Sequence, residues 1–193
     1  NSVVIVMTRW NKILEVDPDN LTAWVQPGVV TGALQKEVEK IGLFYPPDPG
    51  SLNVCTIGGN VANNAGGLRG LKYGVTKNYV LGIEMILPNG ELLKAGGKNM
   101  KDVAGYNLRD FIIGSEGTLG IVTKVLLKLI PKPSQAITLL IYFDKLVDAG
   151  KTVSDIIASH IVPSMMEFLD NTTINCVEDF THIGLPRKSE AIL

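Results

Sequence analysis

Several features are scarce in this 193-residue sequence, and each scarcity excludes a class of protein. Only two cysteines occur, Cys55 and Cys176, so a disulfide framework is not expected and a reducing compartment is indicated. The net charge is -1 and no basic run occurs, which argues against nucleic-acid binding. No apolar run approaches the ~20 residues of a membrane-spanning helix. We therefore expect a cytoplasmic protein, with any membrane association peripheral and through partners.

Residues for metal binding or nucleophilic catalysis are equally scarce. The two histidines, His160 and His182, lie far apart without a metal-binding motif, and Cys176 has no second sulfur nearby. We expect structural or surface roles for all three, a packing role for Cys55, and no metal site. Asp48 and Glu116 are loop carboxylates. Such residues cap turns or backbone amides more often than they act as general bases, although a base is the open alternative.

The residues that are present alternate between strand and helix patterns, in a composition typical of globular enzymes: 46% hydrophobic and 19% charged. Alternating or β-branched runs predict strands at 3–7, 13–17, 22–26, 79–88, 91–95, 120–130, 137–143 and 165–169. Apolar residues at helical spacing predict helices at 30–41, 108–113, 146–159 and 172–179. Asn89-Gly90 predicts the turn of a hairpin. The expected fold class is therefore α+β.

The segment Lys132-Pro-Ser-Gln135 is the expected domain boundary, because proline and polar residues interrupt the pattern there. We expect one domain over residues 1–133 and the beginning of a second over residues 134–193. The sequence opens on a strand pattern and stops as an apolar run begins. Both ends are therefore expected to be cuts in a longer chain.

Two glycine-rich segments are the candidate binding surface. Residues 58–67 contain Gly58, Gly59, Gly66 and Gly67, and glycine lets backbone amides approach a diphosphate or a flat ring. Residues 114–120 have glycine at every third position and lead into a strand, an arrangement that suits a purine edge. Tight loops without a ligand are the alternative for both. An NAD-type fingerprint and a phosphate-binding P-loop are absent from the sequence. Arg69 and Lys72 are expected to solvate the first loop rather than to bind an anion.

Several motifs in order carry a resemblance to a known family. They are Pro46-Pro-Asp-Pro-Gly-Ser51, Thr56-Ile-Gly-Gly-Asn60, Asn63-Asn-Ala-Gly-Gly67, Tyr73-Gly74 and Gly114-Ser-Glu-Gly-Thr-Leu-Gly-Ile-Val-Thr123. Together they resemble the FAD-linked oxidase family, which has the vanillyl-alcohol-oxidase or PCMH-type fold. The branch with the FAD-linked subunit of glycolate oxidase and the D-lactate dehydrogenases is the most similar.

The resemblance implies a fold and a site. Residues 1–133 would be the second subdomain of a PCMH-type FAD-binding domain, with the first subdomain missing, and residues 134–193 the start of an α+β, ferredoxin-like cap. Backbone and small side chains would bind FAD. The implied contacts are Pro27, Gly28, Asp48, Pro49, Gly50, Ser51, Thr56, Gly58, Gly59, Asn63, Ala65, Gly66, Glu116, Gly117, Gly120, Ile121 and Val122.

The resemblance also implies a reaction: oxidation of a D-2-hydroxy acid such as glycolate or D-lactate to the 2-oxo acid, with hydride transfer to the flavin. The expected partners are the small-molecule substrate and either partner subunits or an electron acceptor. The family's histidine motif and basic carboxylate binders have no counterpart here, so no catalytic residue is predicted and the chain alone is expected to be inactive. The alternatives are a non-catalytic flavoprotein subunit and an enzyme of the ether-lipid synthase branch.

Overall fold

The computed structural model describes residues 3–193, which form two compact units. The first unit ends at Pro133, and the second is Ser134–Leu193. Each has its own sheet, helices and buried side chains. The α+β class expected from the sequence is confirmed.

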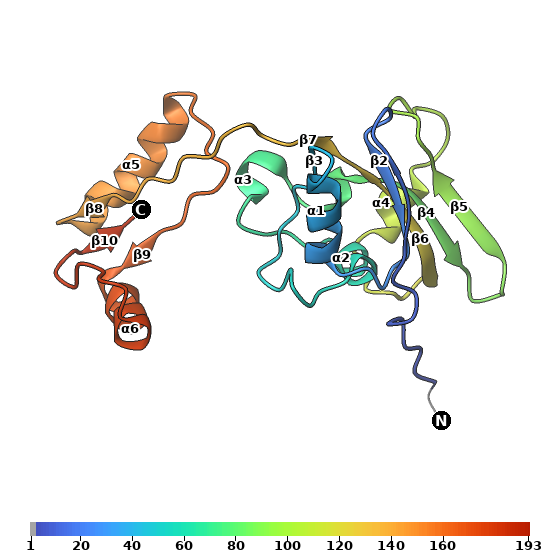
Figure 1. The fold of residues 1–193 in the computed structure, drawn as a ribbon, viewed down its shortest axis with the longest axis horizontal. Coiled ribbons are helices and arrows are strands. Elements are labelled where there is room, and N and C mark those ends of the chain that lie inside the picture. Colours follow the sequence, from blue (N-terminus) through green and yellow to red (C-terminus); the bar gives the residue numbers. More distant parts are fainter. Residues whose placement is uncertain (1–2) are drawn as a thin grey trace. The chain divides into compact units, whose positions relative to one another are not determined.

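A five-stranded antiparallel sheet forms the frame of the first unit (Figure 1). Its strands, in spatial order, are β1 (Ile13–Asp17), β2 (Thr22–Val25), β6 (Ile121–Lys128), β4 (Val80–Ile86) and β5 (Leu92–Gly96). All five were predicted from the sequence. At the predicted hairpin between β4 and β5, Gly90 adopts a left-handed φ of 86°. Because β6 lies in the middle of the sheet, the glycine-rich loop that leads into it is held by the frame.

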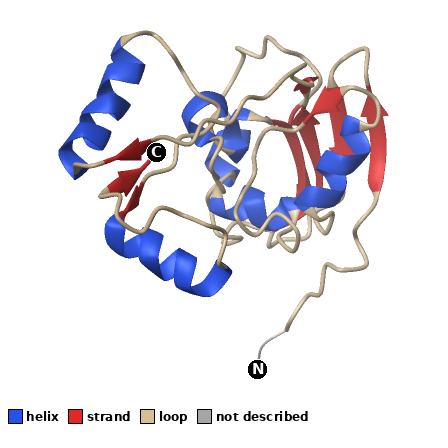
Figure 2. Cartoon of the chain, turned by 60° about the vertical axis from the view of Figure 1, so that its left-hand side comes forward, coloured by secondary structure: helices blue, strands red, loops and turns tan. Residues whose placement is uncertain are grey.

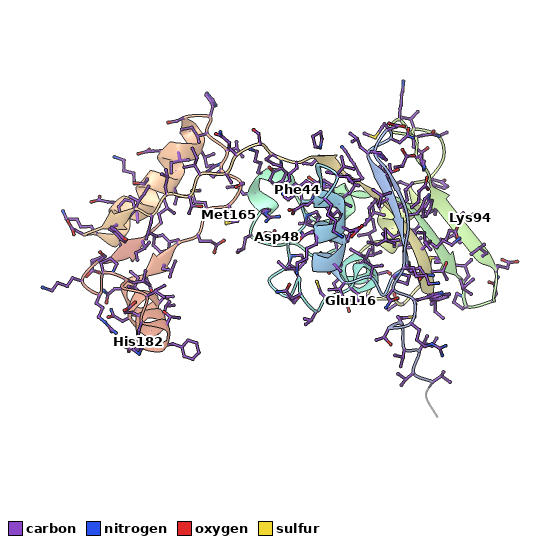
Figure 3. The ribbon with its side chains drawn as sticks, in the orientation of Figure 1. Phe44, Asp48, Lys94, Glu116, Met165 and His182 are labelled. Carbon is purple, nitrogen blue, oxygen red and sulfur yellow. The ribbon has the colours of Figure 1, made fainter. Side chains whose placement is uncertain are left out.

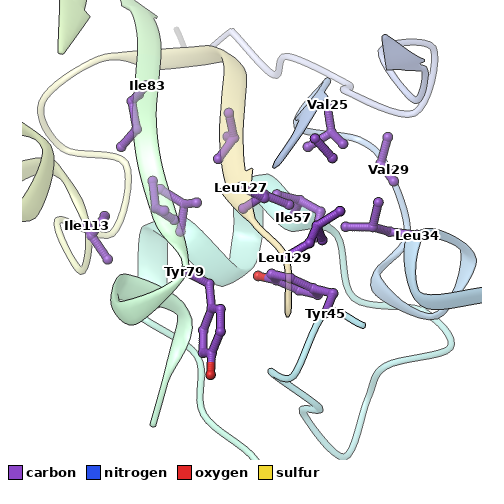
Figure 4. Close-up of a cluster of buried hydrophobic side chains, with 14 of the residues drawn as sticks. Val25, Val29, Leu34, Tyr45, Ile57, Tyr79, Ile83, Ile113, Leu127 and Leu129 are labelled. Carbon is purple, nitrogen blue, oxygen red and sulfur yellow. The ribbon is translucent and has the colours of Figure 1, made fainter. Parts of the chain in front are cut away.

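Helices pack on one face of this sheet and enclose the core (Figures 1 and 4). They are α1 (Thr31–Glu39), α2 (Ile57–Asn63) and α4 (Leu108–Ile112). Leu34 of α1 and both Ile57 and Val61 of α2 are fully buried with strand residues such as Val25 and Leu127. Burial of each such side chain contributes about 1.5–3 kcal/mol. Helix α2 is therefore fixed to the sheet by Ile57 and Val61, although it is glycine-rich.

The structure differs from the sequence predictions at several short elements. Residues 3–7 form no strand, and Val3 and Val4 are 90% and 83% exposed. A β-branched run becomes a strand only beside a partner, and no described strand pairs with this one. The sequence patterns predict no helix or strand between residues 42 and 78, and the short elements there were missed. They are β3 (Leu43–Phe44), α2, α3 (Gly70–Tyr73) and the 3-10 turn η1 (Thr76–Asn78). Strand β3 pairs with β7 (Ile130–Pro131).

The second unit has two helices and three short strands (Figure 2). Helices α5 (Leu146–Ala158) and α6 (Asn171–Thr181) agree with the predictions. The strands, in spatial order, are β8 (Tyr142–Phe143), β10 (Ala191–Ile192) and β9 (Leu169–Asp170). The predicted strands at 137–143 and 165–169 are thus too long, because only their last residues pair with β10. None of the helices within residues 3–193 is long and apolar enough to cross a bilayer.

Candidate functional site

The two glycine-rich segments, separated in sequence, meet at the end of α2. The amide of Gly114 donates to Val61 O at 2.9 Å, and that of Glu116 donates to Ala62 O at 2.8 Å. The last carbonyls of a helix lack partners within the helix, so these bonds also terminate α2. Gly114, Glu116 and Gly117 all have left-handed φ values, between 53° and 84°, which turn the loop back onto the helix. The structure therefore joins both predicted segments into one surface.

The predicted contact residues divide by exposure. Those exposed on this unit are Gly50, Ser51, Gly59, Asn63, Gly66, Glu116, Gly117 and Ile121. Those partly buried are Thr56, Gly58, Ala65, Gly120 and Val122. Those buried are Pro27, Gly28, Asp48 and Pro49. The exposed set is accessible on the surface of this unit, whereas the buried set is not.

One group of glycines is required by packing within the chain. A Cβ on Gly58 would lie 2.6 Å from Pro27 Cβ, and the Gly58 amide donates to Pro27 O at 2.8 Å. A Cβ on Gly67 would lie 2.1 Å from Asp48 O, and one on Gly120 would lie 2.4 Å from Ile86 O. These glycines let neighbouring backbones approach closely. The Pro27-Gly28 turn and the 46–51 loop are thereby fixed against the glycine-rich segments.

A second group has no such packing requirement. A Cβ on Gly50 would meet nothing within 4 Å, and one on Gly59 would meet only Thr56 Oγ1 at 3.4 Å. Neither residue has a left-handed φ. No contact within residues 3–193 therefore requires glycine at these two positions. A ligand that lies against the backbone would require it, because a side chain would keep the ligand away.

Backbone donors are available on the same surface. Among the described residues, the exposed amides of Gly66 and Gly67 donate no hydrogen bond, and the Gly59 amide makes only a long one of 3.4 Å to Thr56 Oγ1. Successive unpaired amides such as those of Gly66 and Gly67 can bind anionic oxygens. Open glycines beside free amides suit a ligand that combines a flat ring with a diphosphate, as FAD does.

Beneath the surface lies a small polar cluster that the sequence analysis did not identify. Asn60 Nδ2 donates to Thr31 Oγ1 at 2.7 Å, and Thr31 Oγ1 is 3.3 Å from Cys55 Sγ. Cys55 is half-buried in this contact. The nearby Tyr45 hydroxyl is buried without a hydrogen-bond partner among the described residues, and burial raises the pKa of that phenol well above its usual range. The sequence contained one indication of this cluster: Thr31 and Asn60 are polar residues on helix faces that otherwise face the core.

Asp48 and Arg69 connect the loops on either side of α2. Asp48 is 6% exposed; its Oδ1 accepts the Arg69 amide at 3.0 Å, and its Oδ2 lies 3.2 Å from Arg69 Nε. The Arg69 guanidinium lies over the Phe44 ring, 5.0 Å from its centroid. The expected backbone-capping role of Asp48 is confirmed. The expected solvation role of Arg69 is wrong, because a buried carboxylate and an aromatic ring offer its side chain a better environment than water.

The remaining sequence candidates lie on the surface. His160 and His182 are exposed and have left-handed φ values of 62° and 52° just after α5 and α6 (Figure 3 labels His182). In residues 3–193 no group of metal-ligating side chains comes together. Two cavities, of about 380 and 490 Å³, lie against β5 and β1 respectively, and neither is lined by a predicted contact residue. The candidate site in this chain is therefore an open surface.

Two family models match the chain in order. The FAD binding domain matches residues 1–96, and the C-terminal domain of FAD linked oxidases matches residues 132–193. The first match includes the predicted contacts up to Gly66. The second glycine-rich loop, residues 114–120, lies between the two matches. Its place in the site rests on the hydrogen bonds to Val61 and Ala62.

Similar proteins cover nearly all of the chain. A glycolate oxidase subunit GlcD from Bacillus subtilis is 53% identical over 99% of this chain and 41% of its own length. A D-lactate dehydrogenase from Anaerostipes hadrus is 44% identical over 92% of this chain and 37% of its own length. A solved alkyldihydroxyacetonephosphate synthase superposes with a TM-score of 0.76 at 27% identity, over 96% of this chain and 36% of that one. The chain thus spans about two fifths of the curated relatives.

Proposed function

The chain belongs to the FAD-linked oxidase family, and from this premise we propose that it is part of an FAD-dependent oxidoreductase that oxidises a D-2-hydroxy acid. The resemblance and the PCMH-type fold expected from the sequence are confirmed. FAD is the cofactor of both matched families. The observation that carries the proposal is the joining of the two glycine-rich segments into one surface with open glycines and free amides.

The residues of this chain fit FAD in defined ways. We propose that Gly50 and Gly59 let the flavin ring approach the backbone, since a side chain there would occupy otherwise empty space. The free amides of Gly66 and Gly67 would donate to the diphosphate. Glu116, Gly117 and the start of β6 would contact the adenosine half through backbone atoms. The buried Pro27, Gly28, Asp48 and Pro49 would act by supporting this surface.

The proposed chemistry converts a 2-hydroxy acid into a 2-oxo acid. When bound, FAD supplies the acceptor for the hydride that leaves the α-carbon. This chain's role is to bind and orient the flavin and to exclude water from one side of it. The hydroxyl proton requires a base, and we assign none to this chain, because the family's histidine motif has no counterpart in its sequence. The first unit would be the second half of the FAD-binding domain, and the second unit would be the beginning of the cap.

Glycolate or D-lactate is the proposed substrate class, supported by relatives at 53% and 44% identity that carry these substrates in their names. The likeness to alkyldihydroxyacetonephosphate synthase supports a second candidate, an ether-lipid-forming enzyme, at only 27% identity. Because one relative is named as a subunit, we also propose partner subunits. From the low cysteine content we propose a cytoplasmic location, with any membrane association peripheral and through such partners.

The full-length protein tests this proposal. We expect it to purify with a flavin absorbance band near ~450 nm, to release FAD on denaturation, and to reduce an artificial dye when given glycolate or D-lactate. A flavin-containing protein that reacts with none of a panel of D-2-hydroxy acids would instead favour the synthase candidate. A folded protein without flavin would refute the proposal.

A further inference from the structure

The buried Asp48 carboxylate holds two loops of the proposed site together. Its own backbone lies in the 46–51 loop before α2, and both of its oxygens contact Arg69, which follows the 63–67 loop. The absence of a Cβ at Gly67 allows the two backbones to approach, since a Cβ there would lie 2.1 Å from Asp48 O. This contact joins the loop that carries Gly50 to the one that carries Gly66.

Aromatic side chains hold the Arg69 side of this contact. The guanidinium lies over Phe44, and the Phe44 ring meets Tyr73 edge-on with centroids 5.9 Å apart. Phe44 is 7% exposed, so the ring is a fixed platform. This position requires a side chain that contacts both the Phe44 ring and the Asp48 carboxylate. Arginine does so, because its flat guanidinium lies over the ring while an N–H donates to the carboxylate. A lysine ammonium is a point charge without that plane.

We infer that the Asp48–Arg69 pair is a positioning device that sets the spacing of the 46–51 and 63–67 loops for FAD without touching the cofactor. The inference rests on the proposed function. A competing role exists: the Arg69 side chain is 29% exposed and could attract the diphosphate as a simple positive charge. The two roles differ in what a lysine at this position can restore, because lysine keeps the charge and loses the stacked, directional contact.

The test measures FAD affinity in the full-length protein, by flavin fluorescence after apoprotein is mixed with FAD, for Arg69→Lys, Arg69→Gln and Asp48→Asn. We expect each to weaken FAD binding by about tenfold or more, the effect typical of losing a residue that orients a binding group. Lys77→Gln is the matched control, since it removes a nearby exposed charge that contacts neither Arg69 nor its aromatic platform, and it should leave the affinity unchanged.

Loss of folding is separated from loss of positioning by the double variant Asp48→Asn/Arg69→Gln, which leaves no unpaired buried charge. It should retain the thermal midpoint of the apoprotein and still bind FAD weakly. Wild-type affinity in the double variant, or full rescue by Arg69→Lys, would overturn the inference while the proposed function stands. Absence of FAD from the wild-type protein would instead refute the proposed function itself.

Discussion

At the scale of single residues, Gly58 and Gly59 are adjacent in α2 but differ in the space that each leaves for a side chain. A Cβ on Gly58 would lie 2.6 Å from Pro27 Cβ, whereas one on Gly59 would meet only Thr56 Oγ1 at 3.4 Å. The sequence presents them as equivalent members of one cluster. Packing makes the first a structural glycine and leaves the second open for a ligand.

This difference predicts opposite effects of the same substitution. Gly58→Ala should destabilise the protein by about 1–3 kcal/mol, because the methyl group overpacks the contact with Pro27. Gly59→Ala should leave stability unchanged or raise it by up to about 1 kcal/mol, because alanine favours a helix more than glycine does. In the full-length protein Gly59→Ala should nevertheless weaken FAD binding.

Urea denaturation of the apoprotein and FAD titration check the two effects separately. Gly150→Ala in α5 is the control, since a Cβ there would also meet nothing within 4 Å and the residue lies outside the proposed site. Undiminished FAD affinity in Gly59→Ala would mean that this glycine does not face the cofactor.

At the scale of elements, the loop after α6 is held by one carboxylate. Glu178 is 8% exposed, and its side chain accepts the amides of Gly184 and Leu185 at 2.9–3.1 Å. The Leu185 amide is the main cause that lowers the pKa of Glu178 below its ordinary value. The charged form is thus the one that fits the fold of the second unit.

A pH dependence follows with a definite sign. Because the folded-state pKa of Glu178 is lowered, its stabilisation is fully present above the ordinary glutamate pKa of about 4.3 and is lost as the pH falls through the lowered value. Glu178→Gln should be less stable than wild type at neutral pH, and the difference should shrink towards pH 3. Thermal unfolding of the second unit between about pH 3 and pH 7 checks this. A difference that stays constant over that range would contradict the assignment.

At the scale of the whole molecule, the chain spans about two fifths of its curated relatives, and its proposed FAD surface is open. Residues 1–193 alone should therefore bind FAD much more weakly than the full-length protein does, because this surface supplies only part of the contacts to the cofactor. Parallel FAD titrations of both proteins measure the ratio. Tight, stoichiometric FAD in the 193-residue chain would show that the surface described here is sufficient.

The sequence by itself determined the α+β class, the five strands of the main sheet and the α1, α4, α5 and α6 helices, because hydrophobic periodicity is a local property. It also determined the family, because several motifs occur in a fixed order. It did not predict α2 and α3, because glycine has low helix propensity, and the burial of Ile57 and Val61 that stabilises α2 depends on tertiary contacts.

Only the tertiary structure decided how the site residues divide. It joined residues 114–116 to the end of α2, separated packed glycines such as Gly58 from open ones such as Gly59, and paired Arg69 with Asp48. These outcomes depend on contacts between residues far apart in the chain. No local pattern encodes such contacts, because the same glycine or arginine suits a solvated loop as well as a packed one.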